Sequence, residues 1–169
     1  MAISKQSFDR QNKEDVRRLI TRALERLAAA TNLSGINTPQ AIELLMGTWA
    51  QESTGGKYTT QLGGGPARGM WQIEKPTYLD ILNRCSADAY RELLVTAGDP
   101  DALLQDHFDL LVSNHTLCAQ ICRLKYFMSP GLIPEDLEEQ AEYWKKYYNT
   151  ELGAGTVEEY LANYQKYVA

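Results

Sequence analysis

The chain has 169 residues, of which 44% are hydrophobic and 23% are charged, a composition typical of one soluble globular domain and not of a disordered chain. Its net charge of −5 and its lack of any basic run provide no field for holding phosphate backbones, so we expect no nucleic-acid partner. No segment has the roughly 18 apolar residues of a membrane span, and residues 1–18 lack the apolar stretch of a secretory signal. We therefore expect no membrane insertion, and synthesis in a cytoplasm without a signal peptide.

The first half of the chain predicts two helices and a glycine-rich insertion. Residues 1–12 are expected to form a flexible N-terminus, and apolar residues recur at helical spacing over 13–32. The second helix begins at Pro39, with Thr38 as its N-cap, and ends near Glu52. Residues 55–69 contain six glycines, which predict turns, a small β element and a short hairpin at 57–62.

The second half predicts further helices. Pro76 opens one helix and residues 86–97 form the next. From Asp99 onward, apolar residues recur at steps of three or four, which predicts one long central helix of roughly 25 residues before the break at 128–134. A helix over 134–150 follows, and the last helix starts with a capping box. The predicted fold class is mainly α (α+β), in a single domain over residues 1–169.

One helical face of the predicted central helix carries possible metal ligands. His115, Cys118 and Cys122 are spaced at i, i+3 and i+7, and all three residue types bind zinc. A fourth ligand is missing, and Leu103 and Leu111 share the same stripe, so a buried structural face is the favoured interpretation. We expect no metal site and no cofactor, and reduced thiols at the three cysteines.

A carboxylate ends the second predicted helix, in the stretch "TWAQESTGGKY" at 48–58. Glycoside cleavage needs a carboxylic acid that keeps its proton near neutral pH, and burial against apolar groups raises the pKa of a glutamate. Trp49 lies one turn before Glu52, and the segment "GGGPARGMWQI" at 63–73 can fold back over the helix end. Glu52 is then an acid in a cleft; an exposed helix terminus is the alternative.

The same residues resemble a known family. "ES" at a helix end, a glycine-rich loop, "GMWQI" and "KPTYLDI" are similar to the lysozyme-like lytic transglycosylases, over roughly residues 40–80. The segment 143–168 resembles, more loosely, the C-terminal part of lysozyme-like proteins carried in tailed-phage particles. The sequence departs from the family pattern at Trp71, which replaces the usual Met, at Arg68 before the glycine, and in a late motif that lacks its Ala-Gly ending.

The resemblance implies a lysozyme-like fold and a mechanism with one catalytic residue, Glu52. Glu52 would protonate the oxygen between N-acetylmuramic acid and N-acetylglucosamine, while the acetamido group of the substrate stabilises the positive charge. As a carboxylate it would then accept the proton of the C6 hydroxyl, which gives a 1,6-anhydro sugar. A two-carboxylate glycosidase would need a partner at about 5–9.5 Å, for which Glu74 is a second-rank candidate.

Eight further residues are candidates for substrate binding, and several have a structural alternative. They are Ser53, Tyr58, Gly69, Met70, Trp71, Gln72, Tyr148 and Asn149. Ser53 either orients Glu52 or ends the helix, and Gln72 either binds a sugar or satisfies the loop backbone. Trp71 and Tyr58 can stack on sugars, although Trp71 is favoured as a core residue. Gly69 permits close approach of the backbone.

The predicted function is cleavage of peptidoglycan glycan strands by a lytic transglycosylase. By resemblance, the protein is carried in a phage virion with other virion proteins and is delivered to the periplasm or cell wall. Two alternatives remain: a hydrolytic endolysin, and a virion structural or assembly protein with little or no activity. The second could dock a partner through Tyr160, Leu161, Tyr164 and Tyr167 of the last helix, although packing on its own core is favoured.

Overall fold

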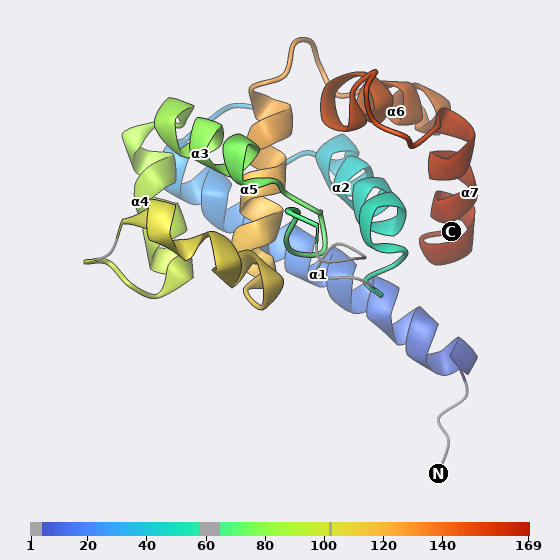
Figure 1. Cartoon of the computed structure of the whole chain (residues 1–169), viewed down its shortest axis with the longest axis horizontal. Coiled ribbons are helices and arrows are strands. Elements are labelled where there is room, and N and C mark those ends of the chain that lie inside the picture. The colour runs from blue at the N-terminus through green and yellow to red at the C-terminus, as the bar shows by residue number, and fades with distance from the viewer. Residues whose placement is uncertain (1–4, 58–64, 102) are drawn as a thin grey trace.

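The computed structural model describes residues 5–57, 65–101 and 103–169, and its helices surround α5 (His115–Phe127). Figure 1 shows two groups of helices on either side of α5. One group contains α3 (Lys75–Arg84), α4 (Ala87–Ala97) and the 3-10 helix η1 (Leu104–Val112). The other contains α2 (Pro39–Ser53), α6 (Leu137–Trp144), the π-helix η2 (Lys145–Asn149) and α7 (Val157–Tyr167).

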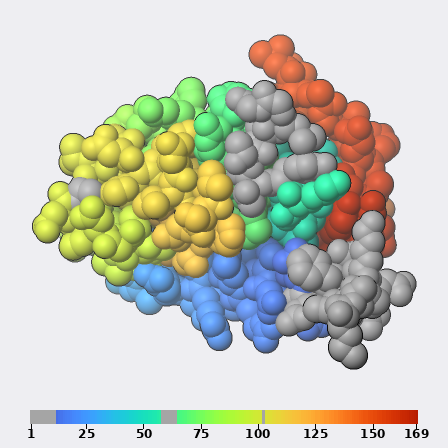
Figure 2. Space-filling model, turned by 60° about the horizontal axis from the view of Figure 1, so that its bottom comes forward, coloured from blue at the N-terminus to red at the C-terminus, as the bar shows by residue number. Residues whose placement is uncertain are grey.

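The N-terminal helix joins the two groups. α1 (Lys5–Thr31) runs across the molecule and contacts α2, α4 and α5. In the space-filling view of Figure 2, α1 (blue) lies along the lower edge, with the segment around η1 (yellow) above it and the C-terminal segment (red) on the right. None of the helices in the described ranges is long and apolar enough to cross a membrane.

The mainly helical class is confirmed, whereas the β element is small. Within residues 5–57, 65–101 and 103–169 no strand is present, and the extended pairing is one isolated antiparallel bridge between Arg68 and Ile73. Their two backbone hydrogen bonds are each 2.9 Å long. Residues 58–62 of the predicted hairpin lie outside the described residues.

Most predicted helix ends are confirmed by their caps. The side chain of Thr38 accepts from the backbone of Ala41, and Pro39 follows at the first helical position. Thr156 and Glu159 form the predicted capping box. The start of α1 differs, because residues 5–12, expected to be flexible, belong to the helix. They contain no glycine or proline, so nothing prevents the helix from extending through them.

The prediction of one long central helix is wrong. η1 ends at Val112, and α5 starts at His115 with Asn114 as its N-cap. The side chain of Asn114 accepts from the backbone of Leu117 at 3.0 Å and donates to the carbonyl of Thr96 at 2.9 Å. These side-chain bonds compete with helical backbone bonds and interrupt the helix at Asn114. The apolar periodicity of the sequence continues through this break and therefore does not reveal it.

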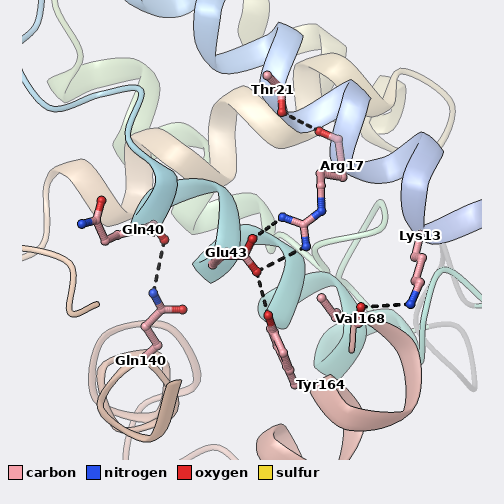
Figure 3. A network of polar contacts seen from close by, with 8 residues as sticks. All are labelled: Lys13, Arg17, Thr21, Gln40, Glu43, Gln140, Tyr164 and Val168. Carbon is pink, nitrogen blue, oxygen red and sulfur yellow. Dashed lines mark hydrogen bonds and ion pairs between the residues drawn. The ribbon is translucent and has the colours of Figure 1, made fainter. Parts of the chain in front are cut away.

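Polar and close steric contacts fix α2, the helix that carries Glu52. Glu43 forms an ion pair with Arg17 of α1 and accepts a 2.7 Å hydrogen bond from Tyr164 of α7 (Figure 3). At Gly47 a Cβ atom would lie 2.0 Å from the hydroxyl oxygen of Tyr160, so α7 can approach α2 only because this residue is glycine. α2 is therefore held between α1 and α7.

Candidate functional site

Glu52 lies in a cavity of about 390 Å³ at the C-terminal end of α2. The other residues that line it come from the loop before α3, from α3, α5 and η2, and from the loop after η2: Gln72, Ile73, Glu74, Thr77, Lys125, Tyr148, Asn149, Thr150 and Gly153. Three stretches that are distant from one another in the sequence, at 72–77, 125 and 148–153, thus converge on one carboxyl group. Most of these side chains are polar, which suits a ligand rich in hydroxyl and amide groups.

The carboxyl group of Glu52 is held by a buried tryptophan. The indole Nε1 of Trp144 donates to Oε1 of Glu52 at 2.9 Å. Trp144 is fully buried, and its ring packs against Tyr160 with 5.2 Å between the ring centroids. This packing leaves the indole one orientation, so it fixes the position of Oε1.

Burial raises the pKa of Glu52 to about 7, because removal from water disfavours the carboxylate. The hydrogen bond from Trp144 and the positive charge of Lys125 act in the opposite direction and offset part of this effect. The negative end of the α2 dipole lies at the same place and also disfavours a carboxylate. Glu52 can therefore carry a proton near neutral pH and release it during a reaction.

Lys125 is the cation that lines this cavity. Its side chain is partly buried, and Nζ lies 4.5 Å from the centroid of the Tyr148 ring. Burial lowers the pKa of Lys125, whereas the nearby acids Glu52 and Glu74 raise it. Among the described residues, no carboxylate oxygen lies within 4.0 Å of Nζ.

The structure brings Gln72 to Glu52, as the sequence predicts. Gln72 has a φ of +48°, and its side-chain amide donates to the carbonyl of Gly69 at 2.9 Å. The structural alternative for this residue therefore holds, since the amide supports its own loop. Gln72 nevertheless lines the cavity, and its amide oxygen is an acceptor that this bond does not use.

The three residues before Gln72, at 69–71, are buried and do not line the cavity, contrary to their assignment as substrate-binding residues. For Trp71 the core is the position that the sequence favours. Trp71 is fully buried, and its Nε1 donates to the carbonyl of Leu45 at 2.9 Å. Met70 is buried as well. Gly69 has a φ of +80°, and a Cβ there would lie 2.5 Å from the sulfur of Cys118. These residues hold the loop in place and do not reach the cavity.

Ser53 belongs to the helix end and not to the cavity. Its hydroxyl donates to the carbonyl of Trp49 at 2.8 Å and accepts from the backbone of Gly56 at 2.9 Å. Both bonds close the C-terminus of α2, so the predicted orienting bond to Glu52 is absent. Tyr58 lies outside the described residues.

Tyr148 and Asn149 reach the cavity from the π-helix η2. The hydroxyl of Tyr148 donates to the carbonyl of Trp71, which ties η2 to the loop opposite. Lys145 donates from Nζ to Oδ1 of Asn149 at 2.7 Å and to the carbonyl of Gly153 at 2.9 Å. Both predicted residues therefore lie beside Glu52, in positions that other residues fix.

Backbone strain is concentrated here. Only four described residues other than glycine have a positive φ, and two of them, Gln72 and Thr150, line the cavity. A third, Thr54, follows two residues after Glu52. Such conformations cost about 1–3 kcal/mol each and persist where packing imposes them, as it often does at functional sites.

Trp144 and Lys125 are functional candidates that the sequence prediction missed. Trp144 lies four residues before Tyr148, so helical spacing puts both on one face. Lys125 follows Cys118 and Cys122 at steps of four and three along the same stripe of α5. The signal in the sequence is that Lys125 places a charge on a helical stripe that is otherwise buried, where an unpaired charge is rare.

The cysteine face of α5 is part of the core. Cys118 and Cys122 are fully buried, and burial raises the pKa of both thiols. In the part of the chain that the structure describes, no group of three or more histidine, cysteine, aspartate or glutamate side chains could hold a metal ion. The buried structural interpretation therefore holds for Leu111, Cys118 and Cys122, whereas His115 is half-buried and Leu103 is 64% exposed.

Comparisons of the chain with protein-family models, with curated proteins and with solved structures found no significant match.

Proposed function

We propose that the protein cleaves the glycan strands of peptidoglycan, as a lytic transglycosylase of lysozyme-like type in which Glu52 is the catalytic acid and base. The observation that carries this proposal is a partly buried carboxyl group in a polar cavity with a pKa raised to about 7. A group of this kind is protonated often enough at neutral pH to donate to a glycosidic oxygen. Delivery with a phage particle belongs to the same proposal and rests on the resemblance alone.

The contacts of Glu52 suit both stages of such a reaction. In the first stage the protonated acid donates to the bridging oxygen, and the acetamido group of the substrate stabilises the positive charge. In the second stage the carboxylate accepts the proton of the C6 hydroxyl. Trp144 and Lys125 both favour the carboxylate, so they stabilise the state of Glu52 between the two proton transfers.

Hydrolysis is the second candidate, because Glu74 lines the same cavity. Glu74 is exposed and precedes α3 as its N-cap residue without a side-chain capping bond. Its carboxylate is therefore free to act on a water molecule in a two-carboxylate mechanism. The chemistry of the products distinguishes the two routes, since hydrolysis gives reducing ends and transglycosylation gives 1,6-anhydro ends.

A structural role without activity is less well supported. The face of α7 that could dock a partner mostly packs within the protein. Tyr160 is fully buried against Trp144, and Tyr164 donates to Glu43 of α2. Tyr167 also packs on the core. The aromatic side chains of α7 are therefore used mainly for packing within the domain. The docking surface has less support than the polar cavity around Glu52.

The test is digestion of purified peptidoglycan by wild type and by Glu52→Gln, with fragments identified by mass spectrometry. We expect 1,6-anhydro fragments from wild type and a rate about 10²–10⁴-fold lower for the variant, since general acid and base roles have this size. Glu142→Gln, a change of the same type at an exposed residue of α6, should retain the wild-type rate.

Equal inactivity of wild type and Glu52→Gln on all peptidoglycan types would contradict the proposal. Reducing ends that disappear in Glu74→Gln would instead establish hydrolysis with Glu74 as the second carboxylate. A wild-type rate in Glu52→Gln would remove Glu52 from the mechanism.

A further inference from the structure

The cavity around Glu52 shares two lining residues with a second cavity. A neighbouring cavity, also of about 390 Å³, is lined by Pro76, Thr77, Asp80, Ile81, Arg84, Lys125, Met128, Ser129 and Tyr147. Thr77 and Lys125 line both cavities. The two spaces therefore adjoin, and Lys125 lies at their junction.

The ammonium group of Lys125 contacts an aromatic ring and has no close anionic partner among the described residues. Nζ lies over the ring of Tyr148, at 4.5 Å from its centroid, and this ring is itself held by the hydrogen bond to Trp71. Within the described ranges no carboxylate oxygen lies within 4.0 Å of Nζ. A partly buried cation without a paired anion favours a negatively charged ligand.

The other charged groups nearby do not provide that anion or replace that cation. Glu52 and Glu74 raise the pKa of Lys125, but among the described residues neither carboxylate lies within 4.0 Å of Nζ, and Glu52 is already bonded to Trp144. Arg84, the other cation that lines the second cavity, is paired with Asp80 at 2.9 Å. Lys125 is therefore the residue at the junction that is available to an incoming negative charge.

We propose that Lys125 is a specificity-determining residue that binds a carboxylate of the glycan substrate at the junction of the two cavities. The charges of the site favour a single carboxylate over a polyanion, because Glu52, Glu74 and Asp80 also line the two cavities and would repel a larger negative charge. The identity of the ligand rests on the proposed function, since peptidoglycan carries carboxylates at fixed places along its strands. They belong either to the peptide stem or to a lactyl group freed by removal of the stem.

Binding to soluble strand fragments tests this inference without a need for cleavage. Calorimetry on Glu52→Gln would compare fragments that bear stems, fragments whose stems have been removed, and both after amidation of their carboxylates. We expect amidation to weaken binding by about tenfold, as for loss of one charge-assisted hydrogen bond at a partly exposed site. The fragment that shows this loss identifies the stem or the lactyl group as the source.

The matched variants are made in the same Glu52→Gln background. Lys125→Gln should bind native and amidated fragments equally, and Lys125→Arg should retain the preference for native fragments. Lys146→Gln removes a charge at an exposed neighbour that lines neither cavity and should retain the preference as well.

Each outcome of these binding measurements supports or overturns the role of Lys125. Equal binding of native and amidated fragments by Glu52→Gln itself overturns the inference, and so does a preference that persists in Lys125→Gln or an absence of binding to every fragment. If Lys125→Gln does not fold, the amidation comparison and Lys125→Arg still decide. A preference without any cleavage by wild type would leave this inference standing and the proposed activity refuted, whereas cleavage without a preference would do the reverse.

Discussion

Glu52 is subject to opposing influences on its carboxyl group. Desolvation favours the neutral acid, while the indole of Trp144 and the charge of Lys125 favour the carboxylate. Desolvation is the largest of these effects, so the pKa is raised to about 7 and is not lowered as in an ordinary hydrogen-bonded carboxylate. The balance leaves one residue able to donate and to accept a proton at the same pH.

This balance predicts that the protein loses stability as pH rises. The pKa of Glu52 is about 7 in the folded protein and 4.5 as an ordinary value, so the folded state binds the proton more tightly than the unfolded state. The stabilisation is complete below about pH 4.5 and is lost as pH rises through 7. After allowance for partial exposure it amounts to about 2–3 kcal/mol.

Urea denaturation of wild type and Glu52→Gln at several pH values measures this contribution. The two proteins should have similar free energies of unfolding near pH 4.5, and the variant should be more stable by about 2–3 kcal/mol near pH 8. A difference that is the same at every pH would mean that Glu52 titrates alike in the folded and unfolded states.

The loop of residues 68–73 is the element that closes the site beside α2. The backbone bridge between Arg68 and Ile73 closes the turn. The indole of Trp71 donates to α2, and the carbonyl of Trp71 accepts a hydrogen bond from Tyr148 of η2. Gly69 allows the turn to lie directly against α5 and η1, because a Cβ would lie 2.5 Å from both the Cys118 sulfur and the Leu111 carbonyl oxygen.

Gly69→Ala should therefore destabilise the protein by about 2–4 kcal/mol, since the clash involves backbone and the φ is positive. The matched control is Gly35→Ala. Gly35 has a similar φ of +78°, but a Cβ added there would meet nothing within 4 Å, so this change should cost only about 1 kcal/mol. Urea denaturation of both variants measures the difference, and equal costs would mean that the loop does not pack as described.

The sequence predicts elements well where a local signal exists. Caps at Thr38 and Thr156 and the proline at position 76 identify helix starts, because each acts within one turn. The break at Asn114 was missed, since apolar periodicity passes through it and the capping asparagine also bonds to distant Thr96. The start of α1 was placed too late for a similar reason, as hydrophobic spacing is a poor guide to the solvated end of a helix.

At the scale of the whole molecule, the site is assembled from residues far apart in the chain. Glu52 and Trp144 are separated by 92 positions, and their hydrogen bond exists because α2 and α6 pack side by side. Glu52, Gln72, Tyr148 and Asn149 could be predicted as members of the site, the last two only through a family resemblance. Trp144 and Lys125 could not, because their roles depend on how helices pack and not on any local motif.

The pKa of Glu52 also depends on the whole assembly, because Trp144 of α6 and Lys125 of α5, which offset part of the effect of burial, come from helices other than α2. The most direct measurement is an NMR titration of the glutamate side-chain carboxyl carbons, with the Glu52 signal assigned by its absence in Glu52→Gln. We predict a midpoint near pH 7 for this signal. A midpoint near 4.5, the ordinary value, would contradict this prediction and would remove the physical basis for Glu52 as an acid at neutral pH.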